Sequence, residues 1–233
     1  MIVSSLASLT RVEGMFLVFP IAIILLANRH KLQTSNKTLR YKVRDLFSTI
    51  IKDKKLVLIS LSPFFGLLLY MLYLFITTGD FLRFYHAQAI FHNGRSTDHI
   101  ILLPQVYYRY IRIILTASHN FIYFVAVNEF ITFNLLFFIL LYDLWMLLKQ
   151  KKDANKMNLL GLNIFSLANL ILPTLTGTLT SLPRYALLSL SFFIRIAELK
   201  NTLLRYFLLT LFTIFHFILL SLFIQGFFCK LKR

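Results

Sequence analysis

The 233-residue sequence contains few of the residues that build disulfides, metal centres or acidic sites. Its single cysteine, Cys229, cannot form an internal disulfide and gives no Cys/His spacing of the kind that binds zinc. Asp and Glu together number only 9, against 25 Lys and Arg, so carboxylates for acid–base chemistry are scarce. Charged residues make up 15% of the chain, which is too few for a water-soluble globular protein of this length.

Hydrophobic residues take the place of the missing charges. They make up 58% of the sequence, 25 residues are phenylalanine, and the mean hydropathy is +0.73. Several apolar runs reach the ~20 residues that a helix needs to cross the hydrocarbon core of a bilayer. The composition therefore predicts an all-α, polytopic transmembrane helix bundle of about six spans, with residues 1–233 forming a single membrane domain.

The net charge of +16 is compatible with nucleic-acid binding or with a membrane surface. Lys and Arg cluster beside the apolar runs, as they do when basic loops stay in the cytoplasm and contact anionic headgroups. This pattern favours membrane lipids as partners, predicts no nucleic-acid binding, and indicates a multi-pass protein of a bacterial-type inner or plasma membrane. The densest basic segment, residues 28–55, is predicted to be a cytoplasmic loop with an amphipathic helix over 41–51.

The apolar runs also predict where the chain crosses the membrane. The first run predicts a helix that begins near residue 5 and carries Arg11 and Glu13 in its outer turns. The next predicts a span over 56–76, kinked at Pro63 and Gly66. Further spans are predicted over 130–148, 159–173, 183–197 and 203–228.

In this topology residues 78–120 form an extracytoplasmic loop. After Pro104 its polar residues recur at helical spacing, at Gln105, Arg109, Arg112 and Thr116. The spacing predicts a helix in the membrane interface, with its arginines toward phosphate or water. The loop histidines His86, His92 and His99 are six and seven residues apart, which does not place metal ligands on one helix face. No cofactor is predicted, and a divalent metal is an alternative only if the loop folds back.

Two acidic residues fall inside the predicted helices. Glu129, with Asn128, marks a division of the long apolar run 121–148 and lies at the outer membrane edge. A carboxylate there is costly unless it is paired, so Glu129 is a functional candidate with an arginine of the interfacial helix as expected partner. Asp143 is one turn from cytoplasmic lysines, and we expect its side chain to reach the inner surface.

Three blocks of sequence resemble a known enzyme family. They are SLTRVEGMFLVFPIAI, GDFLRFYHAQAIFHNGR and LPTLTGTLTSLPRYALLSLSFFI, and they occur in the family's order. The chain resembles the bacterial relatives of the PIG-V glycosylphosphatidylinositol mannosyltransferases, which belong to the GT-C class of multispan glycosyltransferases. The resemblance covers most of the chain, and its second and third blocks are the more specific.

The resemblance implies transfer of a sugar, with mannose as the first candidate, from a polyprenyl-phosphate donor to a lipid-linked or glycan acceptor on the outer face. It matches the family's polar motif positions at Gln88, Arg95 and Arg184, and more weakly at Arg11, Glu13 and Glu129. Arginine suits a lipid phosphate because it gives bidentate donors and keeps its charge, so Arg109 and Arg112 are further candidates. Tyr185, next to Arg184 in the outer turn, is a supporting candidate.

The sequence departs from the family at its N-terminus. Members carry further helices and an outer loop with the acidic residue thought to act as base, and nothing here matches that loop. We therefore expect the chain to be the C-terminal part of a larger GT-C fold, inactive alone and dependent on an upstream polypeptide. Asp80 and Asp98 are the remaining candidates for the base, although turn and helix-cap roles are favoured for both. A non-catalytic assembly subunit or a transporter are the alternative functions.

Overall fold

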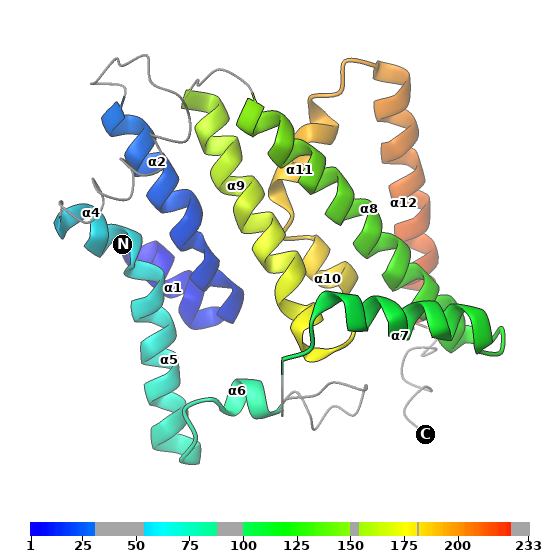
Figure 1. The fold of residues 1–233 in the computed structure, drawn as a ribbon, viewed down its shortest axis with the longest axis horizontal. Helices are drawn as coiled ribbons and strands as arrows, with labels where there is room; N and C mark the ends of the chain where they lie inside the picture. Colours follow the sequence, from blue (N-terminus) through cyan, green and yellow to red (C-terminus); the bar gives the residue numbers. More distant parts are fainter. Residues whose placement is uncertain (31–53, 88–99, 150–153, 181, 225–233) are drawn as a thin grey trace.

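A computed structural model describes residues 1–30, 54–87, 100–149, 154–180 and 182–224. Throughout these ranges the chain is built from helices joined by turns, as Figure 1 shows. In chain order the helices are α1 (Ile2–Thr10), η1 (Val12–Leu17), α2 (Val18–His30), α4 (Lys54–Ser60), α5 (Ser62–Thr78), α6 (Arg83–His86), α7 (Leu103–Thr116), α8 (Phe121–Lys149), α9 (Ala154–Ile171), η3 (Leu172–Thr176), α10 (Leu182–Ala186), α11 (Leu190–Ala197) and α12 (Thr202–Ile224).

Two helical stretches of the described chain are long and apolar enough to cross a membrane, Tyr123–Lys149 and Lys156–Thr176. The bent pair of α4 and α5 makes a third if the two count as one span. The all-helical fold and these spans are consistent with a membrane protein, whereas the predicted total of six spans is not confirmed. The predicted helix over 41–51 lies outside the described residues.

The N-terminal segment differs from the single helix that the sequence predicted. The chain turns at Arg11, whose backbone is extended (φ −145°, ψ 130°), so that α1 and α2 are separate helices joined by η1. Arg11 lies near Glu13 across the turn, with 3.6 Å between Nε and Oε2. An unbroken helix would carry both charges in its interior, whereas the turn leaves Arg11 exposed and its partner close by.

Small residues let α1 lie directly on α5. A Cβ at Gly66 would come within 1.9 Å of the carbonyl oxygen of Ser5, so only glycine permits this approach. The Ser5 hydroxyl also donates a hydrogen bond of 2.7 Å to the carbonyl of Ser62. The predicted kink is confirmed, because α4 and α5 meet at 51° beside Pro63.

The centre of the bundle is formed by α8 and α9, with α2 on the other side of α9. Leucine and phenylalanine side chains from α8, α9 and the α10 segment fill it, among them Phe133, Leu140, Leu170, Leu179 and Leu182. The predicted division of α8 at Asn128 and Glu129 is wrong, since the helix continues through both residues. A side chain of the neighbouring helix α7 donates a hydrogen bond to Glu129. The carboxylate is therefore paired inside the bundle, and the helix does not have to end for it to contact water.

The returning segment after α9, predicted as a single span over 183–197, is short and broken in the structure. Gly177 ends η3 with a positive φ of 88°, which favours glycine, and the chain then forms α10 and α11 as two short pieces. The last helix, α12, leaves most of its described side chains exposed. Such an apolar surface is compatible with contact to lipid.

The helices place two distant segments at one end of the bundle. In Figure 1 the end of α5, then α6, α7 and η3 lie at the bottom, while the C-terminal ends of α2 and α8 lie at the top. The segments expected on the outer side are 79–112 and 176–184, and their described parts, 79–87 and 100–112 with 176–180 and 182–184, lie at the same end. We call it the α7 end.

Candidate functional site at the α7 end

The helix α7 is held against the turn that follows α9 by backbone and side-chain hydrogen bonds. The Ile101 amide donates to the carbonyl of Leu175 at 3.0 Å, immediately before α7 begins. In the second turn of α7, Arg109 donates a hydrogen bond from Nη1 to the carbonyl of Gly177 at 2.9 Å. These bonds join the segment after the second resembling block to the first residues of the third block.

A buried tyrosine links α7, α8 and the same turn. The Tyr110 hydroxyl donates to Glu129 Oε2 at 3.1 Å and accepts from the Leu179 amide at 2.9 Å. Tyr110 is 4% exposed and Glu129 7%, so water does not replace either bond. Burial raises the pKa of the Tyr110 phenol well above its ordinary range, and the charge of Glu129 raises it further. The phenol therefore stays protonated and acts as a donor.

One partner of Glu129 is thus a tyrosine of the predicted interfacial helix, whose arginines the sequence named as expected partners. The expectation that this acid is paired is met by Tyr110. Sequence periodicity could have found the tyrosine, because Tyr110 lies one turn from Val106, and both are buried on the core side of α7. What periodicity could not show is which residue of α8 it meets.

The cationic candidates at this end are on its surface. Arg112 on α7 and Arg184 on α10 are exposed, and neither guanidinium has a partner among the described residues. Tyr185, beside Arg184, is half-buried. Arg109 is exposed but is engaged with Gly177. The α7 end therefore presents fixed cations that could hold an anion.

Asp80 lies between α5 and α6 in a closed local turn. Its Oδ1 accepts from the Leu82 amide at 2.9 Å, and its Oδ2 accepts from His86 Nδ1 at 2.8 Å. The hydrogen bond from His86 lowers the pKa of the Asp80 carboxyl, and the bond from Leu82 lowers it further. Both bonds fit the turn role that the sequence favoured, and a lowered pKa makes Asp80 a weaker base.

The other predicted site residues are not gathered here. Gln88, Arg95 and Asp98 lie outside the described residues. Arg11 and Glu13 belong to the N-terminal hairpin, which packs on α5 and α9. Within the described ranges no three His, Cys, Asp or Glu side chains form a group that could hold a metal ion.

No family model, curated protein or solved structure matches this chain. The family resemblance therefore depends on the three sequence blocks, and the site must be judged by its own geometry.

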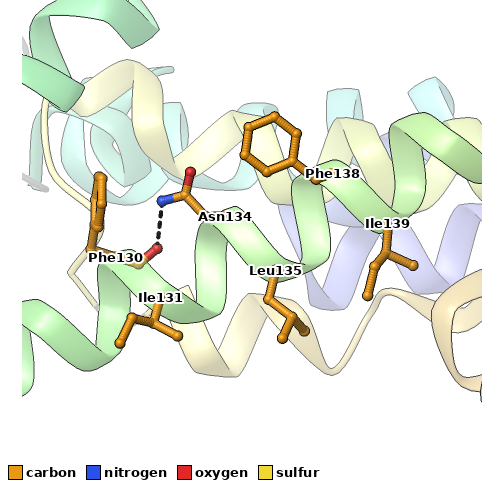
Figure 2. A pocket seen from close by; sticks show the side chains of 6 residues that line it. All are labelled: Phe130, Ile131, Asn134, Leu135, Phe138 and Ile139. Atoms are coloured by element: carbon orange, nitrogen blue, oxygen red, sulfur yellow. Dashed lines mark hydrogen bonds between the residues drawn. The ribbon is translucent and has the colours of Figure 1, made fainter.

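A hollow of about 430 Å³ on α8 does not form part of the site. Figure 2 shows its lining, which comes from α8 alone: Phe130, Ile131, Asn134, Leu135, Phe138 and Ile139. Phe130 and Asn134 are half-buried and contact Tyr107 of α7, whereas the other four lining residues are exposed. The Asn134 amide is already used, donating to the Phe130 carbonyl and accepting from Tyr107. The hollow is an outward apolar surface without converging polar groups.

A second polar cluster lies between α8, α9 and α11, and sequence reasoning missed it. Asp143 is buried, which corrects the expectation that it reaches the inner surface: it accepts from Arg195 Nε and, at 3.0 Å, from Asn163 Nδ2. Ser166 and Ser191 complete the cluster on α9 and α11. The pairing explains the burial, since an acid needs a cation and donors to leave water. The signal in the sequence was Arg195, near the end of the predicted span 183–197.

Proposed function

We propose that this chain is an integral-membrane glycosyltransferase of the GT-C class. It moves a sugar, with mannose as the first candidate, from a polyprenyl-phosphate donor to a lipid-linked or membrane-proximal acceptor on the outer face. The observation that carries the proposal is the contact of the 101–110 segment, which follows the second resembling block in the chain, with the 175–179 turn of the third block at one end of the bundle.

The chemistry of this end suits a lipid phosphate. Arg184 offers a planar, permanently charged guanidinium, and Arg112 supplies a second cation on α7. The bonds of Tyr110 and Arg109 hold the backbone of the 177–179 turn, so this turn loses little freedom on binding. The base that accepts the acceptor's proton is Asp80 or Asp98 in this proposal, with the lowered pKa of Asp80 favouring Asp98.

The test is donor binding by the purified chain in nanodiscs, with polyprenyl-phosphate mannose as the ligand. Arg184→Ala should weaken binding by about 1.5–3 kcal/mol, the range for hydrogen bonds to charged groups, and Arg184→Lys should restore only part of it. Arg205→Ala is the matched control, because Arg205 lies at the start of α12, at the opposite end in Figure 1. Equal donor affinity in Arg184→Ala and the parent chain would show that the donor phosphate does not bind at this site.

A transporter is the second candidate, and the buried Asp143–Arg195 pair favours it. Ionisable groups inside spanning helices mark ion or substrate pathways more often than they serve stability. Uptake of labelled sugars or ions into proteoliposomes tests this function directly. Uptake that Asp143→Asn abolishes, without any donor binding at the α7 end, would support the transporter over the glycosyltransferase.

A further inference from the structure

The surface of α7 is divided into three sectors rather than two. Val106 and Tyr110 face the core, while two different sets of residues are exposed. One set is apolar and includes Tyr108, Ile111 and Leu115, at 69%, 46% and 77% exposure. At 3.6 residues per turn these three share one flank of the helix.

The other exposed flank is polar and basic. Gln105, Arg109, Arg112 and Thr116 recur at steps of four, three and four, and all four side chains are exposed. The helix contains no Asp or Glu, so nothing on α7 itself neutralises its arginines. Core, apolar and basic sectors thus follow one another around the helix axis.

A helix with this order of sectors fits only one kind of surface. Its apolar flank needs a hydrocarbon environment and its basic flank needs water or anions, so the helix axis must lie along the boundary between them. The helix also contacts α8 near Glu129, close to the outer end of the candidate span Tyr123–Lys149. That is the level at which a spanning helix leaves the hydrocarbon core.

We propose that α7 is an anionic-phospholipid-binding helix, with Tyr108, Ile111 and Leu115 in the acyl-chain region and Arg112 on the headgroup phosphate. The occupant is a glycerophospholipid of the surrounding bilayer. Arg112 is the residue chosen because its guanidinium has no partner among the described residues, whereas Arg109 holds Gly177. This inference does not depend on glycosyl transfer, and its test contains no polyprenyl lipid.

The experiment places a fluorescent probe on the apolar flank of the full chain. Tyr108→Trp is made in a Trp145→Phe background, which removes the only native tryptophan. The protein is reconstituted into phosphatidylcholine vesicles that contain brominated phosphatidylglycerol or, at the same mole fraction, brominated phosphatidylcholine. Bromine quenches only nearby indoles, so the two vesicle types report the composition of the lipid next to α7.

Brominated phosphatidylglycerol should quench more strongly than brominated phosphatidylcholine. Arg112→Gln should lower the local preference by about fivefold, which corresponds to about 1 kcal/mol per basic residue at an anionic surface. High salt should remove the preference because it screens the charges. Arg83→Gln on α6, an exposed arginine at the same end, is the control and should leave the preference unchanged.

Three results would overturn the proposal. Equal quenching by the two lipids would show that α7 does not select anionic headgroups. Absence of quenching by either lipid would show that the apolar flank is not in the bilayer. An equal effect of Arg83→Gln would show that the preference is a diffuse charge effect. If Tyr108→Trp fails to fold, Leu115→Trp places the probe on the same flank.

Discussion

The hydroxyl of Tyr110 offers the most direct test of how the α7 end is held together. Tyr110→Phe removes this one oxygen and keeps the ring, which stacks on Phe130 with 6.2 Å between centroids. The change leaves the packing of the ring in place, so its effect comes from the lost hydrogen bonds of this hydroxyl, which include one to Thr180 and the two to buried partners. Of these two, one had satisfied Glu129 and the other the Leu179 amide.

The expected magnitude follows from the burial of these partners. A buried polar group that loses its hydrogen bond costs about 1–3 kcal/mol, so two such groups predict a loss of about 2–6 kcal/mol in the free energy of unfolding. Interhelical hydrogen bonds in membrane proteins average about 0.6 kcal/mol, which sets a lower value near 1 kcal/mol for the pair. The higher range applies here because Tyr110 and Glu129 are both buried, so water cannot take the place of the lost hydroxyl.

The free energy of unfolding can be measured by titrating the protein from mild detergent into dodecyl sulfate. Tyr108→Phe is the matched control, since the exposed hydroxyl of Tyr108 lies on the same helix and should matter by less than about 0.5 kcal/mol. A double-mutant cycle with Glu129→Gln isolates the interaction energy between Tyr110 on α7 and Glu129 on α8. The reasoning is refuted if Tyr110→Phe is as harmless as the control, or if the cycle gives no coupling.

Three other predictions concern the rest of the chain. Gly66→Ala should destabilise the protein by about 1–3 kcal/mol in the same titration, because the new methyl group meets the backbone of Ser5; a neutral result would show that α1 does not pack there. Arg195→Ala should cost about 3 kcal/mol by leaving Asp143 buried without its cation, and the added change Asp143→Asn should recover part of that loss. Asp80→Asn should speed hydrogen exchange at the start of α6 at neutral pH. In the parent protein the Asp80 carboxylate stabilises the turn at pH values above its unfolded pKa, and this stabilisation is lost as pH falls through its lowered folded pKa. The exchange rates of the two proteins should therefore converge in acid. A difference in exchange rate that persists in acid would contradict this origin.

The sequence predicted those features that depend on one segment at a time. The helical class follows from apolar runs of membrane length, and the kink at Pro63 follows from a residue that cannot continue a helix without strain. The turn after α9 was visible in its glycine and threonines, and Gly177 indeed adopts a left-handed backbone. Periodicity likewise placed a helix after Pro104, where α7 is found.

The features that were wrong depend on contacts between segments. The division expected at Glu129 and the surface position expected for Asp143 both followed from treating a lone acid as costly. In the structure Tyr110 and Arg195 supply the missing partners from helices distant in sequence, so neither acid has to reach water. The turn at Arg11 is a similar case, since α5 provides the surface on which α1 folds back.

The central claim is that a polyprenyl-phosphate sugar binds at the α7 end. Photocross-linking tests it most directly, with a photoreactive polyprenyl-phosphate mannose bound to the reconstituted chain and the adducts mapped by mass spectrometry. The account predicts adducts on the 176–186 segment around Arg184, lost on competition with unlabelled donor and retained in excess phosphatidylglycerol. Adducts confined to α12 or to the opposite end of the bundle, or labelling that phosphatidylglycerol removes as well as the donor does, would contradict it.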